Sequence, residues 1–224
     1  MPDLRLVIFD VDGTLVDSQA EILGAMTHAF GAVGLVTPSR AEVLSIVGLS
    51  LPETFAVLCP DLDAATRDEL TRQYRASFHD HAVEDLKRRS PLFPGALEAL
   101  HRLQAQDHTL LAVATGKSKR GLDRLVDQHA LQGLFISGQT SDFHPSKPHP
   151  SMVLTCLADA GVAPHRAVMV GDTRYDMDMA RAAGVATIGV DWGYHAPDTL
   201  GSDRLINTFA ALDAAIDDLI GDPA

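Results

Sequence analysis

The sequence is poor in cysteine and in positive charge, and it contains no long uninterrupted hydrophobic run. Its two cysteines, Cys59 and Cys156, lie far apart and have no partner at metal-ligand spacing. A disulfide framework and a cysteine-held metal are therefore not expected, and a reduced cytoplasmic protein is favoured.

The charge balance is acidic, with 18 Lys and Arg against 30 Asp and Glu and a formal net charge of −12. Nucleic acids and anionic lipids are bound mainly through basic side chains, so neither is expected as a partner. Residues 1–10 include Asp3 and Arg5 and only a short apolar run, which is typical of neither a signal peptide nor a membrane span.

Hydrophobic residues make up 46% of the 224, which is an ordinary share for a globular protein. Continuous apolar runs at 4–9, 109–114, 167–170 and 185–190, with a weaker one at 134–137, predict strands buried on both faces. Helical patterns separate the later runs, so we expect an α/β fold with a doubly wound parallel sheet.

About a hundred residues separate the first two predicted strands, far more than one crossover needs. Apolar spacing predicts a helix near Ile22 to Val33, and Ser39 with Glu42, like Ser50 with Glu53, fits a capping box. We therefore predict a helical cap domain at residues 16–87, inserted into a catalytic core of residues 1–15 and 88–224. A C-terminal helix is predicted over 205–220.

Two acids and a glycine, Asp10-Val11-Asp12-Gly13-Thr14, follow the first predicted strand. Ligand sites of open α/β sheets form at the carboxyl ends of strands. Carboxylates two positions apart can divide the roles of nucleophile or ligand and of acid/base. A calcium loop fits poorly because Thr14 stands where a ligand is needed, but a solvated turn stays open.

Thr115-Gly116 follows the strand predicted at 109–114, and its hydroxyl and amides are suited to an anion. A nucleotide P-loop is excluded because Leu111 stands where that loop needs glycine. Lys147 lies between Ser146 and Pro148, in a segment that cannot be helical at the lysine. Taken singly, a plain turn and an exposed lysine explain these residues equally well.

Asp172 and Asp176 follow the strand predicted at 167–170 and are four residues apart. On a helix that begins here they lie on one side, near its positive end. This spacing suits a metal ligand and a supporting acid, whereas helix capping by Asp172 is the competing interpretation.

Together and in this order, the four motifs resemble those of the haloacid dehalogenase superfamily of phosphotransferases. The resemblance covers nearly the whole chain, including the helical insert after the first motif. Phe93-Pro94-Gly95 is similar to the turn before the second motif in the phosphoglycolate phosphatase branch. The fold implied is a Rossmann-like core with a cap.

The resemblance implies that Asp10 is the nucleophile, which forms an aspartyl-phosphate, and that Asp12 is the general acid and base. Thr115, Gly116 and Lys147 would bind the phosphoryl group.

A metal would be held by Asp10, the backbone carbonyl of Asp12, and Asp172, with Asp176 in support. The charges also favour a metal, because four carboxylates and a phosphate dianion far outweigh one lysine. Oxygen ligands of this kind favour Mg²⁺.

The function expected is therefore a Mg²⁺-dependent phosphatase of a small phosphorylated metabolite, either phosphoglycolate-like or a sugar phosphate monoester. Asp12 favours a phosphatase over a hydrolytic dehalogenase, which lacks an acid there. A β-phosphoglucomutase-like isomerase stays open, and a non-catalytic phospho-sensor is a remote alternative. The oligomeric state is open between monomer and homodimer.

Two surface features of the insert bear on the substrate. Gly48-Leu49 is a candidate cap loop facing the site, although a tight turn between helices explains it as well. The basic residues Arg67, Arg72, Arg75, His79 and His81 are interpreted as a solvated helix face with no assigned role.

Overall fold

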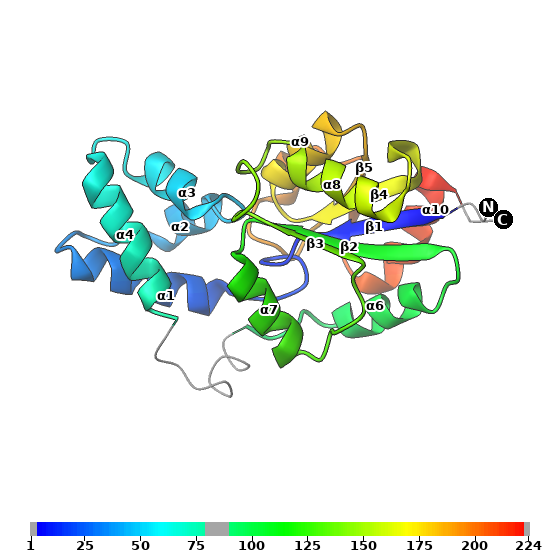
Figure 1. The fold of residues 1–224 in the computed structure, drawn as a ribbon, viewed down its shortest axis with the longest axis horizontal. Helices are drawn as coiled ribbons and strands as arrows, with labels where there is room; N and C mark the ends of the chain where they lie inside the picture. Colours follow the sequence, from blue (N-terminus) through cyan, green and yellow to red (C-terminus); the bar gives the residue numbers. More distant parts are fainter. Residues whose placement is uncertain (1–3, 79–89, 222–224) are drawn as a thin grey trace.

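The computed structural model of the chain describes residues 4–78 and 90–221. Its centre is a parallel sheet with the strand order β3-β2-β1-β4-β5-β6 (Figure 1). The strands are β1 (Arg5–Phe9), β2 (Thr109–Thr115), β3 (Ser137–Thr140), β4 (Ala167–Gly171), β5 (Ala186–Val190) and β6 (Arg204–Ile206). The predicted doubly wound α/β fold is confirmed.

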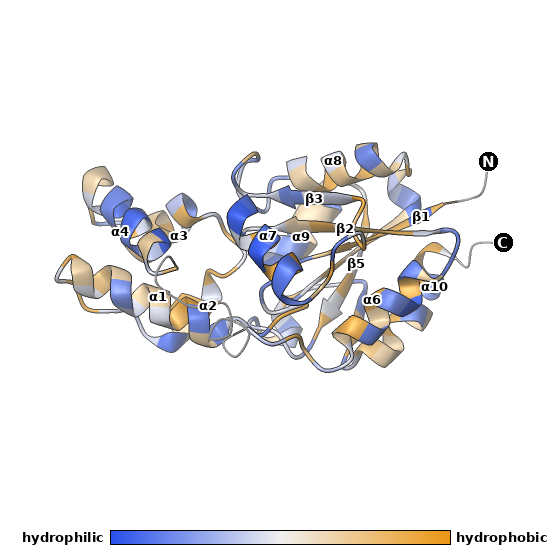
Figure 2. Cartoon of the chain, turned by 60° about the horizontal axis from the view of Figure 1, so that its bottom comes forward, coloured by the Kyte–Doolittle hydropathy of each residue, from blue (hydrophilic) through white to orange (hydrophobic). Residues whose placement is uncertain are grey.

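Helices cover both faces of the sheet, which explains why its central strands β1, β2 and β4 are mostly apolar. Val7 and Phe9 of β1 point into one core with α6 (Ala96–Gln104), α7 (Lys119–Gln128) and α10 (Leu212–Ile220). Leu6 and Ile8 alternate to the opposite core, with α8 (Ser151–Ala160) and α9 (Arg174–Ala182). Figure 2 shows the hydrophobic colour of β2 and the hydrophilic colour of the edge strand β3. Short 3-10 helices lie at Pro164–Arg166, Pro197–Thr199 and Phe209–Ala211.

Four of the helices described between β1 and β2 form a separate cluster at one end of the sheet (Figure 1). They are α1 (Gln19–Ala32), α2 (Arg40–Ser45), α3 (Leu51–Leu58) and α4 (Ala64–Ala76). Their own apolar core includes Phe55, whose ring lies 6.1 Å from that of Phe30 and 6.4 Å from that of Tyr74. We call this cluster the cap. The domain limits at 15/16 and 87/88 stay predictions, and the second lies outside the described residues.

Two predicted elements are wrong in detail. Leu134 lies in a buried loop, and the third strand begins only at Ser137. The predicted helix over 205–220 is instead β6, a 3-10 turn and α10, because apolar residues at helical spacing happen to run through a three-residue edge strand.

The capping prediction holds at one helix and fails at the other. Ser39 and Glu42 form the capping box of α2. Ser50 begins α3 without a side-chain capping bond, and its N–H donates instead to Ser146 Oγ of the core at 2.9 Å. In the described part of the chain, no helix has the length and apolar character needed to cross a bilayer.

Candidate active site

The predicted site residues meet at the carboxyl edge of the sheet because their strands are neighbours. Asp10 follows β1, Thr115 ends β2, and Asp172 follows β4, with β1 lying between the other two. The strand order changes direction at β1, which is where an open α/β sheet forms a binding crevice.

Asp10 is almost completely buried, and its two carboxylate oxygens differ. Oδ1 accepts a hydrogen bond from Lys147 Nζ at 2.8 Å. Oδ2 is buried and has no hydrogen-bond partner among the described residues. Burial raises the pKa of Asp10 to about 7, although the Lys147 ammonium group opposes the shift. A buried oxygen without a donor is suited to meet an electrophile or a cation.

Lys147 joins two carboxylates within the core. Its Nζ lies 2.6 Å from Asp176 Oδ1, in addition to its bond with Asp10, and its side chain is fully buried. Burial lowers the pKa of Lys147, but the two carboxylates outweigh that effect and raise it overall. The lysine is therefore a permanent cation beside Asp10.

Asp176 is fixed by the start of α9. Its Oδ2 accepts bonds from the Thr173 hydroxyl at 2.6 Å and the Thr173 N–H at 3.1 Å, which complete a capping box. Thr173, and not Asp172, is thus the N-cap, so the competing interpretation of Asp172 is wrong. A methyl group on Gly171 would lie 2.5 Å from Asp176 Cβ, which explains a glycine there.

Asp172 is buried and held by donors on both oxygens. The Thr14 hydroxyl donates to Oδ1 at 3.0 Å, and the Tyr194 N–H donates to Oδ2 at 2.8 Å. Burial and the nearby carboxylates of Asp10 and Asp176 raise the pKa of Asp172 well above its usual range. Gly13 has a φ of +87°, and a methyl group there would lie 2.2 Å from Asp172 Oδ2.

Asp10, Asp172 and Asp176 together form a buried acidic cluster. One oxygen from each lies within 4.8 Å of the others. The unpartnered Oδ2 of Asp10 and the raised pKa of Asp172 both indicate negative charge that the lysine does not fully balance. A divalent cation with oxygen ligands fits this donor set.

Asp12 has a partner that the sequence analysis did not identify. Lys117 Nζ lies 2.9 Å from Asp12 Oδ1, with both side chains largely buried. The Lys117 N–H also donates to Thr115 Oγ1 at 3.2 Å. The position of Lys117 directly after a strand-end Thr-Gly could have indicated this role, but the anion site predicted there includes only Thr115 and Gly116.

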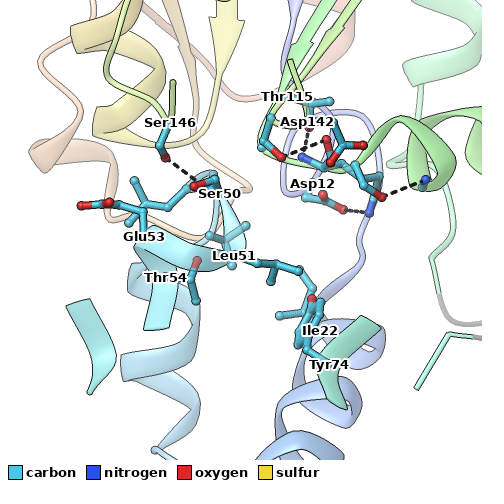
Figure 3. Close-up of a pocket in the computed structure, with 18 of the residues that line it drawn as sticks. Asp12, Ile22, Ser50, Leu51, Glu53, Thr54, Tyr74, Thr115, Asp142 and Ser146 are labelled. Atoms are coloured by element: carbon cyan, nitrogen blue, oxygen red, sulfur yellow. Dashed lines mark hydrogen bonds and ion pairs between the residues drawn. The ribbon is translucent and has the colours of Figure 1, made fainter. Parts of the chain in front are cut away.

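A cavity of about 700 Å³ lies between the cap and this edge of the sheet. Figure 3 shows Asp12 and Thr115 on its core side and Leu51 and Tyr74 on its cap side. Gly48 and Leu49 line it too, as the cap-loop prediction required. The cavity therefore opens directly onto the predicted nucleophile and acid/base.

The cap loop touches the core closely. A methyl group on Gly116 would lie 2.4 Å from the Gly48 carbonyl oxygen. The Ser45 carbonyl accepts bonds from Tyr175 Oη at 3.2 Å and from His195 Nε2 at 3.0 Å. The structure thus has the cap closed over the site.

Comparison with known proteins agrees with the family resemblance of the sequence motifs. The family model described as "Haloacid dehalogenase-like hydrolase" matches residues 7–190. The "Probable phosphatase IndB" of Dickeya dadantii is 35% identical over 211 residues, covering 92% of this chain and 90% of the relative. A "Phosphoglycolate phosphatase" of Mesorhizobium japonicum is 32% identical over 195 residues, covering 84% and 83%.

A solved structure from Haemophilus somnus, described as a predicted phosphoglycolate phosphatase, has the same fold. It superimposes with a TM-score of 0.82 at 26% identity, covering 96% of this chain and 99% of that one.

Proposed function

Because the chain belongs to the haloacid dehalogenase-like hydrolases and is a phosphoric monoester hydrolase, we propose that it cleaves a small phosphorylated metabolite through an aspartyl-phosphate on Asp10. The observation that carries the proposal is the asymmetry of Asp10. One oxygen is held by Lys147, and the other is buried without a donor in the described structure, at the cavity floor. A carboxylate oxygen in this position can attack phosphorus.

Asp12 is proposed as the general acid and base. Its carboxylate lines the same cavity as that of Asp10 and lies two residues further along the chain. It would give a proton to the leaving oxygen and then take one from the water that releases phosphate. Lys117 keeps the Asp12 side chain at this place through their 2.9 Å ion pair.

Thr115, Gly116 and Lys147 are proposed to hold the phosphoryl oxygens. Thr115 and Gly116 line the cavity, where a hydroxyl and a backbone amide can donate to an anion. Lys147 supplies the buried positive charge beside Asp10.

We propose that Asp10, the Asp12 carbonyl and Asp172 hold Mg²⁺, with Asp176 positioning Lys147. When bound, the ion would neutralise charge on the transferring phosphoryl group. Thr14 and Tyr194 fix the Asp172 carboxylate, so its oxygens are already oriented. The glycine at position 13 leaves room for that carboxylate.

The substrate proposed is phosphoglycolate-like or a sugar phosphate monoester, since one of the relatives is named phosphoglycolate phosphatase. The cap covers the phosphoryl site and would exclude water during transfer.

Hydrolysis of p-nitrophenyl phosphate tests the mechanism. Mg²⁺ should support turnover and EDTA should abolish it. Asp10→Asn should remove activity, whereas the matched change at the exposed Asp191, Asp191→Asn, should leave it unchanged. Turnover that survives both EDTA and Asp10→Asn would refute the aspartyl-phosphate mechanism.

A further inference from the structure

The cavity has more room than a two-carbon phosphate needs. Its volume of about 700 Å³ lies in the range of sites for much larger ligands. Its walls come from both the cap and the core, so they can contact a substrate far from the scissile phosphate.

Among the described residues, three arginines line this cavity, although the chain as a whole is acidic. Arg120 and Arg124 lie one turn apart on α7, about 6 Å along its axis and on one face. Arg75 comes from α4 of the cap. Arg75 was interpreted from the sequence as part of a solvated face, but the structure places it in the cavity wall.

The Arg124 side chain contacts the aromatic ring of Phe78, which lies two residues after the end of α4. Its guanidinium carbon lies 5.8 Å from the centre of the Phe78 ring, a cation–π contact between core and cap residues. A ring attracts the charge of the guanidinium without accepting all five of its N–H donors, so N–H groups stay available to bind an anion.

Two acids of the same wall have hydrogen-bond donors of their own, whereas Glu53, which also lines the cavity, is exposed. Glu21 accepts from the Ser90 hydroxyl at 2.6 Å, and Asp142 accepts from the Lys119 N–H at 2.8 Å. Arg75 and Arg120 also have interaction partners in the free protein, so an incoming anion would share or replace them.

We propose that the substrate carries a second anionic group, a carboxylate or a phosphate, and that Arg124 binds it together with Arg120 and Arg75. This inference rests on the proposed function, in which Asp10 takes the scissile phosphoryl group. Arg124 is the sixth residue after the N-cap Ser118, about 9 Å along the helix from the strand edge. This position, together with a cavity of about 700 Å³, favours a spacer between the two anions that is longer than the single methylene group of phosphoglycolate.

Two series of non-hydrolysable phosphonates test the proposal by calorimetry in the presence of Mg²⁺. One series ends in a carboxylate and the other, of equal length, ends in a methyl group. The wild-type protein should bind the longer carboxylates about tenfold more tightly than their methyl counterparts. Arg124→Gln, and separately Arg120→Gln, should remove this preference without changing the Kd of the methyl series.

Arg181→Gln is the matched control, because Arg181 is exposed on α9 and pairs with Asp178 outside the cavity. Equal Kd values for the two series at every length would overturn the proposal, as would an Arg124→Gln variant that weakens both series alike. Hydrolysis of p-nitrophenyl phosphate is measured separately, so a failed phosphatase assay is distinguished from a missing anion site.

Discussion

The buried ammonium group of Lys147 holds two active-site carboxylates together, and its removal should destabilise the fold in a pH-dependent way. Lys147→Met keeps most of the side-chain volume but removes the charge that lies 2.8 Å from Asp10 Oδ1 and 2.6 Å from Asp176 Oδ1. All three side chains are at most 1% exposed, so water cannot replace the lost partner.

Breaking a buried ion pair by removing one partner costs about 3 to 5 kcal/mol. For a chain of this size that corresponds to a fall in Tm of about 6 to 20 °C. The Lys147 charge also lowers the pKa of Asp10 against the effect of burial, so the variant should keep Asp10 protonated to a higher pH. The loss of stability should therefore be larger at about pH 8 than at about pH 5.

Urea unfolding followed by circular dichroism at both pH values measures this loss, with EDTA present so that no cation replaces the lysine. Lys119→Met is the control, because Lys119 pairs with Asp123 on the exposed face of α7 and should contribute less than about 1 kcal/mol. The reasoning is refuted if Lys147→Met costs no more than the control, or if it costs the same amount at both pH values.

Three further predictions concern closure, pH and thiol reactivity. Gly116→Ala should push the cap loop away and lower kcat/KM about a hundredfold. Gly24→Ala should leave kcat/KM unchanged, because a methyl group there has no neighbouring atom within 4 Å. Equal kinetics of the two variants would contradict the closed cap. In EDTA, stability should fall from about pH 5 to about pH 8, because burial raises the pKa of Asp10 to about 7 and the folded state then binds more protons than the unfolded state. Mg²⁺ should reduce this slope in thermal melts, and a slope that Mg²⁺ leaves unchanged would argue against the metal site. Burial raises the pKa of the Cys156 thiol to about 12, so this thiol should react with a thiol reagent only on unfolding. The half-buried Cys59 should react in the native state. Equal reaction rates of the two thiols in the native protein would contradict this packing.

The sequence was most informative at the ends of buried strands, where a polar residue interrupts an apolar run. Asp10, Thr115 and Asp172 each come directly at the end of an apolar run, and parallel strands bring such ends to one edge. The same rule explains why the fold class and the clustering of the acids could be predicted without the structure.

Contacts between distant segments could not be predicted in this way. The Asp12–Lys117 ion pair joins residues after β1 and β2, and no local pattern specifies which lysine reaches which acid. The Tyr194 N–H that holds Asp172 is a backbone group after β5, and any residue there could supply it.

Short or edge elements were also missed, because periodicity needs length. β6 has three residues, with Arg204 and Leu205 exposed and Ile206 buried, so its signal merged with the apolar spacing of α10. The gathering of Arg75 from the cap and Arg120 and Arg124 from the core around one cavity also appears only when the cap lies on the core.

The most direct test of the central claim is the detection of a phosphorylated Asp10. Asp12→Ala should slow the release of phosphate, so acid quenching during turnover with Mg²⁺ should trap the intermediate. Peptide mass spectrometry should then show one hydroxylamine-sensitive phosphoryl group on Asp10. A burst of product with no phosphoryl group on the chain, or with the group on another residue, would contradict the assignment of Asp10 as the nucleophile.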